Sequence, residues 1–560
     1  MKDFEASVAF LGQWGRFQQV VFFLLCASVV PNGFGAFSVV FLTDTPAHRC
    51  LVPEVNLTQD WLDVIIPIEV VDGKQQLSRC SRFRLDVVRN LSALGLAPAV
   101  EVDLSDLPQE TCVDGWSYSR DVYQSTIVSQ FDLVCRDQWK QPFTSTLYFL
   151  GVLCGSFFSG LLSDRFGRKP VLFATMAIQT VFIFVQIFSN SWTVFVVLLF
   201  ISGLGQISNY ISAFVLGNEI LTGRVRVLFS SLGVCLAFAF GFMMLPLFAY
   251  FLRDWRSLLL ATSLPSLLYI PLWWWIPESP RWLLSRGRVE EAEAAVRKAA
   301  EMNKVEAPQV IFEDHSLHAD VTHLHPKEQT NVFDLLRTKP IRDTTAIMCL
   351  VWFTLSTGYY TLSLNTSHLH ADPYVSCFLS AAAEVPAYTL SWLALRFLPR
   401  RPSAVGILLV GGASLYSIQL VPESLPALST ALGMLGKCVI TAGIGLGFAY
   451  TAELYPTALR NTAAGTLTAV SRVGGCVSPF VFQLSVYFKP LPHIVMGTLA
   501  VVSAFAAFFL PESFGRPLPQ TIDQMPKRIL LTHYNGPTEQ KHGRAVDVLP
   551  PVVHPRSEEN

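Results

Sequence analysis

Gly160-Leu-Leu-Ser-Asp164-Arg165-Phe-Gly167-Arg168-Lys169-Pro170 is a polar turn between two apolar segments, residues 141–161 and 171–189. Each segment is about long enough to cross a ~30 Å hydrocarbon core as a helix. The turn carries four charges within six residues, and three of them are positive. Positive charges beside membrane helices favour the cytoplasmic side, and the two glycines allow a tight turn or a close backbone approach. The stretch therefore predicts two membrane helices joined by a cytoplasmic turn.

The composition extends this prediction to the whole chain. Of its 560 residues, 51% are hydrophobic and only 15% are charged, whereas a soluble protein carries about 25% charged residues. The net charge of −1 says nothing about nucleic acid, but no basic run suggests a nucleic-acid partner, and none is expected. Twelve apolar segments are expected to be membrane helices: 20–42, 141–161, 171–189, 194–216, 229–251, 257–276, 343–364, 374–395, 403–420, 426–450, 464–486 and 491–510.

The predicted fold is an all-α membrane protein with both termini in the cytoplasm. Basic residues mark alternate connections between the segments, and the number of segments is even. No short apolar run with a cleavage site follows the polar start, so the first helix is expected to be retained. The expected parts are a six-helix half over 1–276, a cytoplasmic linker with short helices over 277–342, a second six-helix half over 343–516 and a cytoplasmic tail over 517–560.

Residues 43–140 are then one large loop on the outside of the cell. The loop carries two acceptor sequons for N-glycosylation, at Asn56 and Asn90. It also carries four cysteines, and an even number of cysteines in an exterior segment predicts two disulfides. Three pairings are possible, and the spacing does not choose among them. The cysteines are Cys50, Cys80, Cys112 and Cys135.

The two halves repeat each other. Glu219-Ile followed by Arg226 recurs as Glu453-Leu followed by Arg460, and Pro277-Glu-Ser279 recurs as Pro511-Glu-Ser513. Both pairs are offset by 234 residues (453−219 and 511−277). Two parallel halves predict a substrate site between them at mid-membrane depth. The polar turn at 160–170 does not repeat well, because residues 396–402 keep the cations and lose the acid.

Four ionisable residues fall inside predicted spans, where charge is costly and usually functional: Glu384, Lys437, Glu453 and Arg472. Arg472 lies too deep to snorkel comfortably, so it needs either a protein carboxylate or a substrate carboxylate. Glu453 lies near the cytoplasmic end of the tenth span. Its alternative role is to pair with a loop arginine such as Arg460 or Arg224.

Aromatic residues accompany these polar positions. They are Tyr210, Phe238, Tyr359, Tyr360, Phe448 and Tyr450. Such rings most often serve packing, but a ring-lined pocket attracts a quaternary ammonium by cation–π interaction, worth up to ~2 kcal/mol when desolvated. One buried cation together with several rings favours a zwitterionic substrate that carries a carboxylate at one end and an ammonium at the other.

An enzymatic function is not expected. Residues 217–224 resemble a phosphate-binding loop in part, but Thr222 stands where that loop needs glycine, and Arg224 replaces its lysine and hydroxyl pair. We therefore expect no ATP hydrolysis, and we predict neither a metal site nor a cofactor.

The polar turn resembles the loop between the second and third helices of major facilitator superfamily transporters, which implies twelve membrane helices in two halves and alternating access. The whole chain resembles the organic-ion branch, solute carrier 22, and within it the organic cation/carnitine transporters. The resemblance rests on the sequon-bearing first loop and on the stretches Pro277-Glu-Ser-Pro-Arg-Trp282, Thr451-Ala-Glu-Leu-Tyr-Pro-Thr-Ala-Leu-Arg460 and Gly205-Gln-Ile-Ser-Asn-Tyr210. It implies conformational gating by Gly160, Asp164, Arg165, Gly167, Arg168, Glu219, Arg226 and Arg460.

The resemblance also implies roles in binding. Arg472 stands where zwitterion and anion carriers have an arginine and cation carriers have an aspartate. Asn32, Gln179 and Glu453 match polar residues tied to sodium dependence in the carnitine carrier. The expected substrate-binding residues are Arg472, Asn209, Tyr210, Tyr359, Tyr450, Phe448 and Thr468. Phe238 and Phe448 replace tyrosines of that carrier, and Ile444 replaces a phenylalanine, which reshapes the aromatic cage.

These observations predict a secondary active transporter of the plasma membrane, most simply for sodium-dependent uptake of carnitine or a related betaine. Two alternatives remain open within transport: a carrier that prefers ergothioneine, and a sodium-independent facilitator or exchanger of cations such as tetraethylammonium. The deep Arg472 argues against a purely cationic ligand. A receptor or structural membrane protein is the alternative outside transport.

Overall fold

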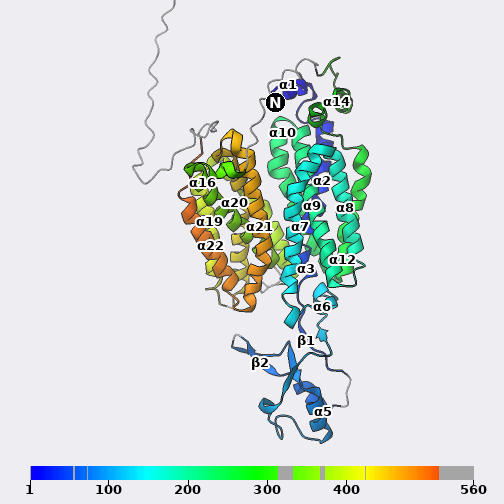
Figure 1. The fold of residues 1–560 in the computed structure, drawn as a ribbon, viewed down its shortest axis with the longest axis vertical. Helices are drawn as coiled ribbons and strands as arrows, with labels where there is room; N and C mark the ends of the chain where they lie inside the picture. Colours follow the sequence, from blue (N-terminus) through cyan, green and yellow to red (C-terminus); the bar gives the residue numbers. More distant parts are fainter. Residues whose placement is uncertain are drawn as a thin grey trace, which may run out of the picture.

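The computed structural model describes residues 2–53, 57–71, 73–312, 332–365, 372–422 and 424–515. Within these residues, ten stretches are helices long and apolar enough to cross a membrane. Figure 1 shows two helix bundles side by side and a small domain that projects from one end of them. That end is called the loop-domain end below. The opposite end, which carries α14 (Val289–Asn303), is called the linker end.

The N-terminal bundle holds the first six predicted segments. Gly33 and Gly241 let the first and fifth segments approach, because a Cβ on either residue would overlap the backbone of the facing helix. This close contact forms one wall of the space between the halves. The helices are α2 (Arg16–Phe37), α3 (Val39–Leu42), α7 (Lys140–Phe166), α8 (Arg168–Gln186), α9 (Trp192–Ile220), α10 (Gly223–Leu228), α11 (Val234–Phe251) and α12 (Trp255–Tyr269).

The C-terminal bundle holds the other six segments, so every predicted membrane segment overlaps a helix. The eighth segment is interrupted at Ala383 between two helices. Of the helices in this bundle, α19 and the 17-residue α22 are not among the ten spans. The helices are α16 (Lys339–Leu364), α17 (Pro373–Ala382), α18 (Glu384–Phe397), α19 (Arg400–Ile418), α20 (Pro426–Leu454), α21 (Thr457–Gln483) and α22 (Leu491–Ala507).

The loop domain is small and cross-linked. Cys50 bonds to Cys112 and Cys80 bonds to Cys135, which confirms two disulfides and selects one of the three pairings. Short strands also form in this loop, in three two-stranded antiparallel sheets, beside a core that includes Trp61. The strands are β1 (His48–Cys50), β2 (Ile68–Val71), β3 (Lys74–Leu77), β4 (Ser81–Phe83), β5 (Gln109–Thr111) and β6 (Trp116–Tyr118), with helices α4 (Gln59–Val64) and α5 (Leu85–Ala93).

The described part of the linker includes two α-helices. α13 (Pro280–Ser285) and α14 pack against the first residues of the chain. Asn303 joins this cluster to the start of α2, because its side chain accepts from the Phe17 N–H at 2.8 Å and donates to the Leu11 carbonyl at 3.1 Å. The rest of the linker, at 313–331, and the predicted tail from 516 onward lie outside the described residues.

The two halves meet near the loop-domain end. The Tyr374 hydroxyl of α17 donates to the Val122 carbonyl at 2.9 Å, and the Tyr374 ring stacks on Phe41 of α3. The Thr146 hydroxyl of α7 donates to the Cys476 carbonyl of α21 at 3.0 Å. At the linker end, in contrast, the main polar networks each join elements of one half, as described below. The halves are thus joined at the loop-domain end of this conformation.

Candidate substrate cavity and the networks at the linker end

A cavity of about 190 Å³ lies between the halves, as their parallel repeat predicted. Both halves contribute to its wall. From the N-terminal half come Asn32, Tyr148, Phe149, Gln206, Tyr210 and Phe238, and from the C-terminal half come Trp352, Tyr359, Tyr360, Tyr388, Ile444, Phe448, Thr468 and Arg472. Six of the predicted positions therefore line one cavity: Asn32, Tyr210, Tyr359, Phe448, Thr468 and Arg472.

Arg472 is the cation of this cavity wall. It is half-buried on α21, and its Nη1 donates to the Tyr360 hydroxyl at 3.2 Å. Its Nε is buried and has no hydrogen-bond partner. Among the described residues, no carboxylate lies within ion-pairing distance of the guanidinium. The site thus offers an anion two features that a guanidinium fork provides, a full charge and unoccupied donors.

Aromatic rings surround the arginine. Tyr360 contacts Phe149 of the other half, with the ring centroids 4.6 Å apart, and it contacts Tyr359 at 5.1 Å. Tyr210 and Phe238 form an edge-to-face pair on the N-terminal side. The rings therefore come from both halves and face a single space, which is the geometry that cation–π attraction to an ammonium needs.

A buried amide cluster lies in the N-terminal wall. Asn32 donates to Asn209 at 3.0 Å, and Asn209 donates to the Leu172 carbonyl at 3.1 Å. Gln206 donates to the Asn32 carbonyl and accepts from the Tyr148 hydroxyl. Asn209 is fully buried and does not line the cavity, so it supports Asn32. Gln179 is also buried in this half, and its Oε1 has no hydrogen-bond partner.

The structure separates Tyr450 from the residues with which the resemblance grouped it. Its hydroxyl donates to the Pro511 carbonyl at 2.6 Å, and its ring is 1% exposed. It does not line the cavity. Tyr450 instead joins the end of α20 to the segment that follows α22. The rotation of α20 about its axis places the Tyr450 ring against the C-terminal half.

Glu453 is also separated from the other two residues of the predicted sodium trio. Its carboxylate is paired with Arg400 at 3.1 Å and accepts from the Ser513 hydroxyl at 2.7 Å. Asn32 and Gln179 lie in the N-terminal half. Glu453 therefore pairs with a basic residue, as the alternative interpretation expected, but the partner is Arg400 rather than Arg460 or Arg224.

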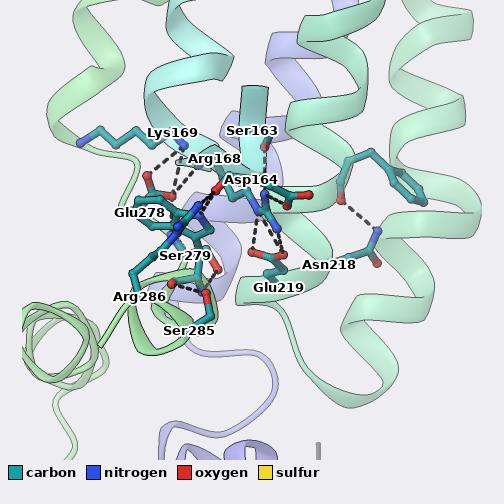
Figure 2. A network of polar contacts seen from close by, with 12 residues as sticks. Ser163, Asp164, Arg168, Lys169, Asn218, Glu219, Glu278, Ser279, Ser285 and Arg286 are labelled. Carbon is teal, nitrogen blue, oxygen red and sulfur yellow. Dashed lines mark hydrogen bonds and ion pairs between the residues drawn. The ribbon is translucent and has the colours of Figure 1, made fainter. Parts of the chain in front are cut away.

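A matching network occupies the linker end of the N-terminal half (Figure 2). Arg168 pairs with Glu219 at 3.0 Å and with Asp164 at 2.6 Å. Glu278 accepts from the backbone N–H groups of Arg168 and Lys169 at 3.1 and 3.2 Å, and burial raises the pKa of its carboxyl. The network thus closes the turn from which the fold was first predicted onto α9 and the start of the linker.

The other predicted gating residues surround this network or lie apart from it. Gly167 has a φ of +107°, a conformation that favours glycine. Gly160 has open space around its Cα, and Arg165 is exposed over the Phe166 ring. Arg226 pairs with Glu5 at 2.7 Å and lowers the pKa of that carboxyl. Arg460 donates to the Tyr455 carbonyl at 3.5 Å. The repeated arginines are therefore not the partners of the repeated acids.

Sequence reasoning missed several members of these sites. Arg400, Glu278 and Glu512 form the networks, and Tyr148 and Tyr388 line the cavity, but none of them was assigned a role in a site from the sequence. The offset of 234 residues already contained a signal for two of them, because the repeated Pro-Glu-Ser motifs place Glu278 and Glu512 at equivalent positions. Of the predicted sequons, Asn90 is exposed on α5, and Asn56 lies outside the described residues.

The comparisons with known proteins agree with this architecture. Residues 115–525 match the family described as "Sugar (and other) transporter". The fold resembles the xylose transporter XylE from E. coli, with a TM-score of 0.58 at 14% identity over 90% of this chain and 100% of that chain. A second structure of XylE gives a TM-score of 0.57 at 17% identity over 89% and 98%. The fold and the cavity define a transporter of the major facilitator superfamily, and not an enzyme.

More similar relatives narrow the family. The chain is 54% identical to "Organic cation/carnitine transporter 2" of Rattus norvegicus, over 94% of each chain. It is 52% identical to the Homo sapiens protein of the same name, over 97% of each chain. It is 53% identical to "Solute carrier family 22 member 4" of Mus musculus, over 94% of this chain and 95% of that one. The chain belongs to the organic cation/carnitine group of solute carrier family 22.

Proposed function

We propose that this protein carries small zwitterions with a quaternary ammonium, carnitine or a related betaine, across the plasma membrane by alternating access. The observation that carries the proposal is Arg472, a guanidinium with no carboxylate partner in the described part of the chain, in a cavity lined by rings from both halves. The names of the similar relatives support the same substrate class. The carboxylate of the substrate binds Arg472, and its ammonium lies against the rings.

Uptake measurements test the substrate directly. Cells that express the protein are expected to accumulate labelled carnitine above mock-transfected cells. Arg472→Lys keeps the charge and loses the fork, so carnitine uptake normalised to surface protein is expected to fall at least about tenfold. Arg472→Asp is expected to favour tetraethylammonium over carnitine. Near-normal carnitine uptake by the lysine variant contradicts the assignment of Arg472 to the carboxylate.

Sodium coupling is the second part of the proposal. Asn32 and Gln179 each have a buried amide oxygen without a hydrogen-bond partner, and amide oxygens are suitable ligands for a hard cation. Asn32 lines the cavity and Gln179 is buried in the same half, so a sodium ion held by these amide oxygens assists binding of the substrate carboxylate. Glu453 contributes to coupling only through the linker-end network.

Gln179→Ala is expected to raise the sodium concentration for half-maximal uptake at least about threefold, with surface expression kept. Gln186 is a matched control, because it lies on the same helix and its Oε1 is also buried without a partner. Gln186→Ala is expected to leave the sodium dependence unchanged. Wild-type uptake that is indifferent to sodium overturns the coupling and leaves the zwitterion proposal standing.

Two other substrate assignments compete with carnitine. Phe238, Phe448 and Ile444 reshape the ring-lined wall, which keeps an ergothioneine-preferring carrier as a candidate. A sodium-independent cation facilitator is disfavoured by the charge of Arg472. One screen of labelled carnitine, ergothioneine and tetraethylammonium, each with and without sodium, separates the three substrate assignments. The compound with the highest ratio of maximal uptake rate to KM is the preferred substrate.

The proposed orientation places the loop domain outside the cell and both termini in the cytoplasm. It is supported by two disulfides, which form in oxidising compartments, and by the basic turn at the opposite end. Treatment with a glycosidase is expected to increase gel mobility. Asn56→Gln combined with Asn90→Gln is expected to abolish most of that shift, and unchanged mobility of the wild type contradicts the orientation.

A further inference from the structure

A second pair of charges is buried beside the cavity. The Lys437 Nζ on α20 lies 3.2 Å from the Glu384 Oε1 on α18, and the two side chains are 1% and 0% exposed. Taking two charges out of water is expensive, and it is tolerated only where each charge is paired and hydrogen-bonded. Neither residue lines the cavity itself, so the pair is not part of the binding wall described above.

Two tyrosines connect Glu384 to that wall. The Tyr359 hydroxyl donates to Glu384 Oε1 at 2.7 Å, and the Tyr388 hydroxyl donates to Oε2 at 3.5 Å. Both tyrosines line the cavity. The carboxylate therefore lies one side chain behind the rings that would hold an ammonium, within the range at which an unpaired charge acts strongly in a low-dielectric site.

Lys437 is completely occupied by the protein. Besides the ion pair, its Nζ donates to the Ser363 hydroxyl at 2.7 Å and to the Ser380 hydroxyl at 3.0 Å, so its three donors are used. The rings of Phe242 and Tyr359 lie 4.8 and 4.9 Å from the ammonium. The lysine thus has no donor left for a substrate carboxylate, and its role is exerted on Glu384.

The charges of this region then add up simply. The Glu384–Lys437 pair is neutral, which leaves Arg472 as the net positive charge at the cavity. We propose that Lys437 is a specificity-determining residue, which masks Glu384 as a counter-ion for cations and so makes the cavity select substrates with a carboxylate. This inference rests on the proposed transport of zwitterions, and it concerns a residue that does not touch the substrate.

The proposal predicts that substitutions of Lys437 and of Glu384 change the relative affinity for the two substrates in opposite directions. Lys437→Gln unmasks the carboxylate, so the affinity for tetraethylammonium is expected to rise relative to carnitine by about tenfold or more. Glu384→Gln leaves the lysine charge unbalanced, so the same ratio is expected to fall. The double variant Glu384→Gln with Lys437→Gln restores a neutral pair, and its ratio is expected to return to the wild-type value. Lys437→Arg keeps the charge and is expected to keep the ratio.

The experiment measures the two inhibition constants, for tetraethylammonium and for carnitine, against uptake of one labelled substrate by the full-length protein. Total uptake falls in any variant that folds poorly or moves more slowly, but the ratio of the two constants does not respond to the amount of active protein. The proposal is supported if the ratio shifts in opposite directions in Lys437→Gln and Glu384→Gln and returns to the wild-type value in the double variant. A ratio that stays constant in all four variants overturns it.

The design also separates this inference from the proposed function. If the wild-type protein is inhibited by neither compound, the proposed function fails. If the wild type responds to both compounds and only the ratio is insensitive to Lys437, the masking role fails and the zwitterion assignment stands. If Lys437→Gln does not reach the membrane, the comparison of Glu384→Gln with the double variant decides: an equal ratio in both overturns the proposal.

Discussion

The linker ends of the two halves carry the same network built from partly different residues. In the N-terminal half Arg168 pairs with Glu219 at 3.0 Å, and in the C-terminal half Arg400 pairs with Glu453 at 3.1 Å. Glu278 accepts from the backbone N–H groups at the start of α8, and Glu512 does the same at the start of α19, at 2.9 and 3.0 Å. Each half thus fastens three segments with one arginine and two acids.

The two networks differ in the further acceptors that the arginine contacts. Arg168 takes Asp164 as a second carboxylate, whereas Arg400 donates to the Leu395 and Leu398 carbonyls at 2.6 and 3.0 Å. Glu453 in turn receives the Ser513 hydroxyl. Backbone oxygens therefore replace the acid that the second turn lacks. The comparison shows that a repeat can disappear from the sequence motif and persist in the contacts, and that Glu453 is the counterpart of Glu219.

The largest effect is expected from the two arginines. Arg168→Ala or Arg400→Ala leaves a half-buried carboxylate without its charged partner, which costs about 1.5–3 kcal/mol. Uptake normalised to surface protein is expected to fall at least about tenfold in both variants. Arg165→Ala is the control, because Arg165 is exposed beside the same network, and it is expected to retain most of the uptake. A normal rate in only one of the two arginine variants contradicts the equivalence of the networks.

The paired acids are expected to have the next largest effect. Glu219→Gln and Glu453→Gln each remove the charge that Arg168 or Arg400 faces, so each is expected to lower the maximal uptake rate several-fold, by about 1 kcal/mol. The sodium concentration for half-maximal uptake is expected to stay the same in both. A change in sodium dependence that is specific to Glu453→Gln means that Glu453 acts in coupling directly, and then the two acids are not equivalent.

The capping acids are expected to matter less. Glu278→Ala and Glu512→Ala remove acceptors from backbone N–H groups at the first turn of a helix, a change that costs about 1 kcal/mol. The thermal midpoint of the purified protein is expected to fall by a similar amount in both variants. Glu290→Ala, at an exposed position of α14, is the control for a removed acid that belongs to neither network. A larger fall for one capping acid than for the other identifies the half whose network is the more stable.

The smallest effect is expected where the halves differ. Asp164 is 68% exposed, and its ion pair with Arg168 is screened by solvent, so Asp164→Asn is expected to change stability by less than about 1 kcal/mol. Ser513→Ala removes the hydroxyl that donates to Glu453, and the thermal midpoint is expected to move by a similarly small amount. A large fall in the thermal midpoint of Asp164→Asn means that the Asp164 carboxylate does more for Arg168 than the backbone oxygens do for Arg400.

Much of the fold could be predicted because hydropathy, charge and repeats are local properties of the chain. All twelve apolar segments overlap helices, the halves are parallel repeats, and the four loop cysteines form two disulfides. The cavity was predicted less completely. Arg472 was found because a deep cation is unusual in any span, whereas Tyr148 carries no signal that separates it from packing residues.

The sequence by itself determined that this chain is a membrane transporter of two halves with a cation at its centre. Only the tertiary structure decided which side chains share a site. In the folded protein Tyr450 lies away from the cavity and Tyr388 lines it. Glu453 pairs with Arg400, and Glu384 pairs with Lys437. The physical reason is that a membrane helix is apolar on nearly every side, so its periodicity does not reveal its rotation. Packing against neighbouring helices sets that rotation, and with it the partners of each buried polar group.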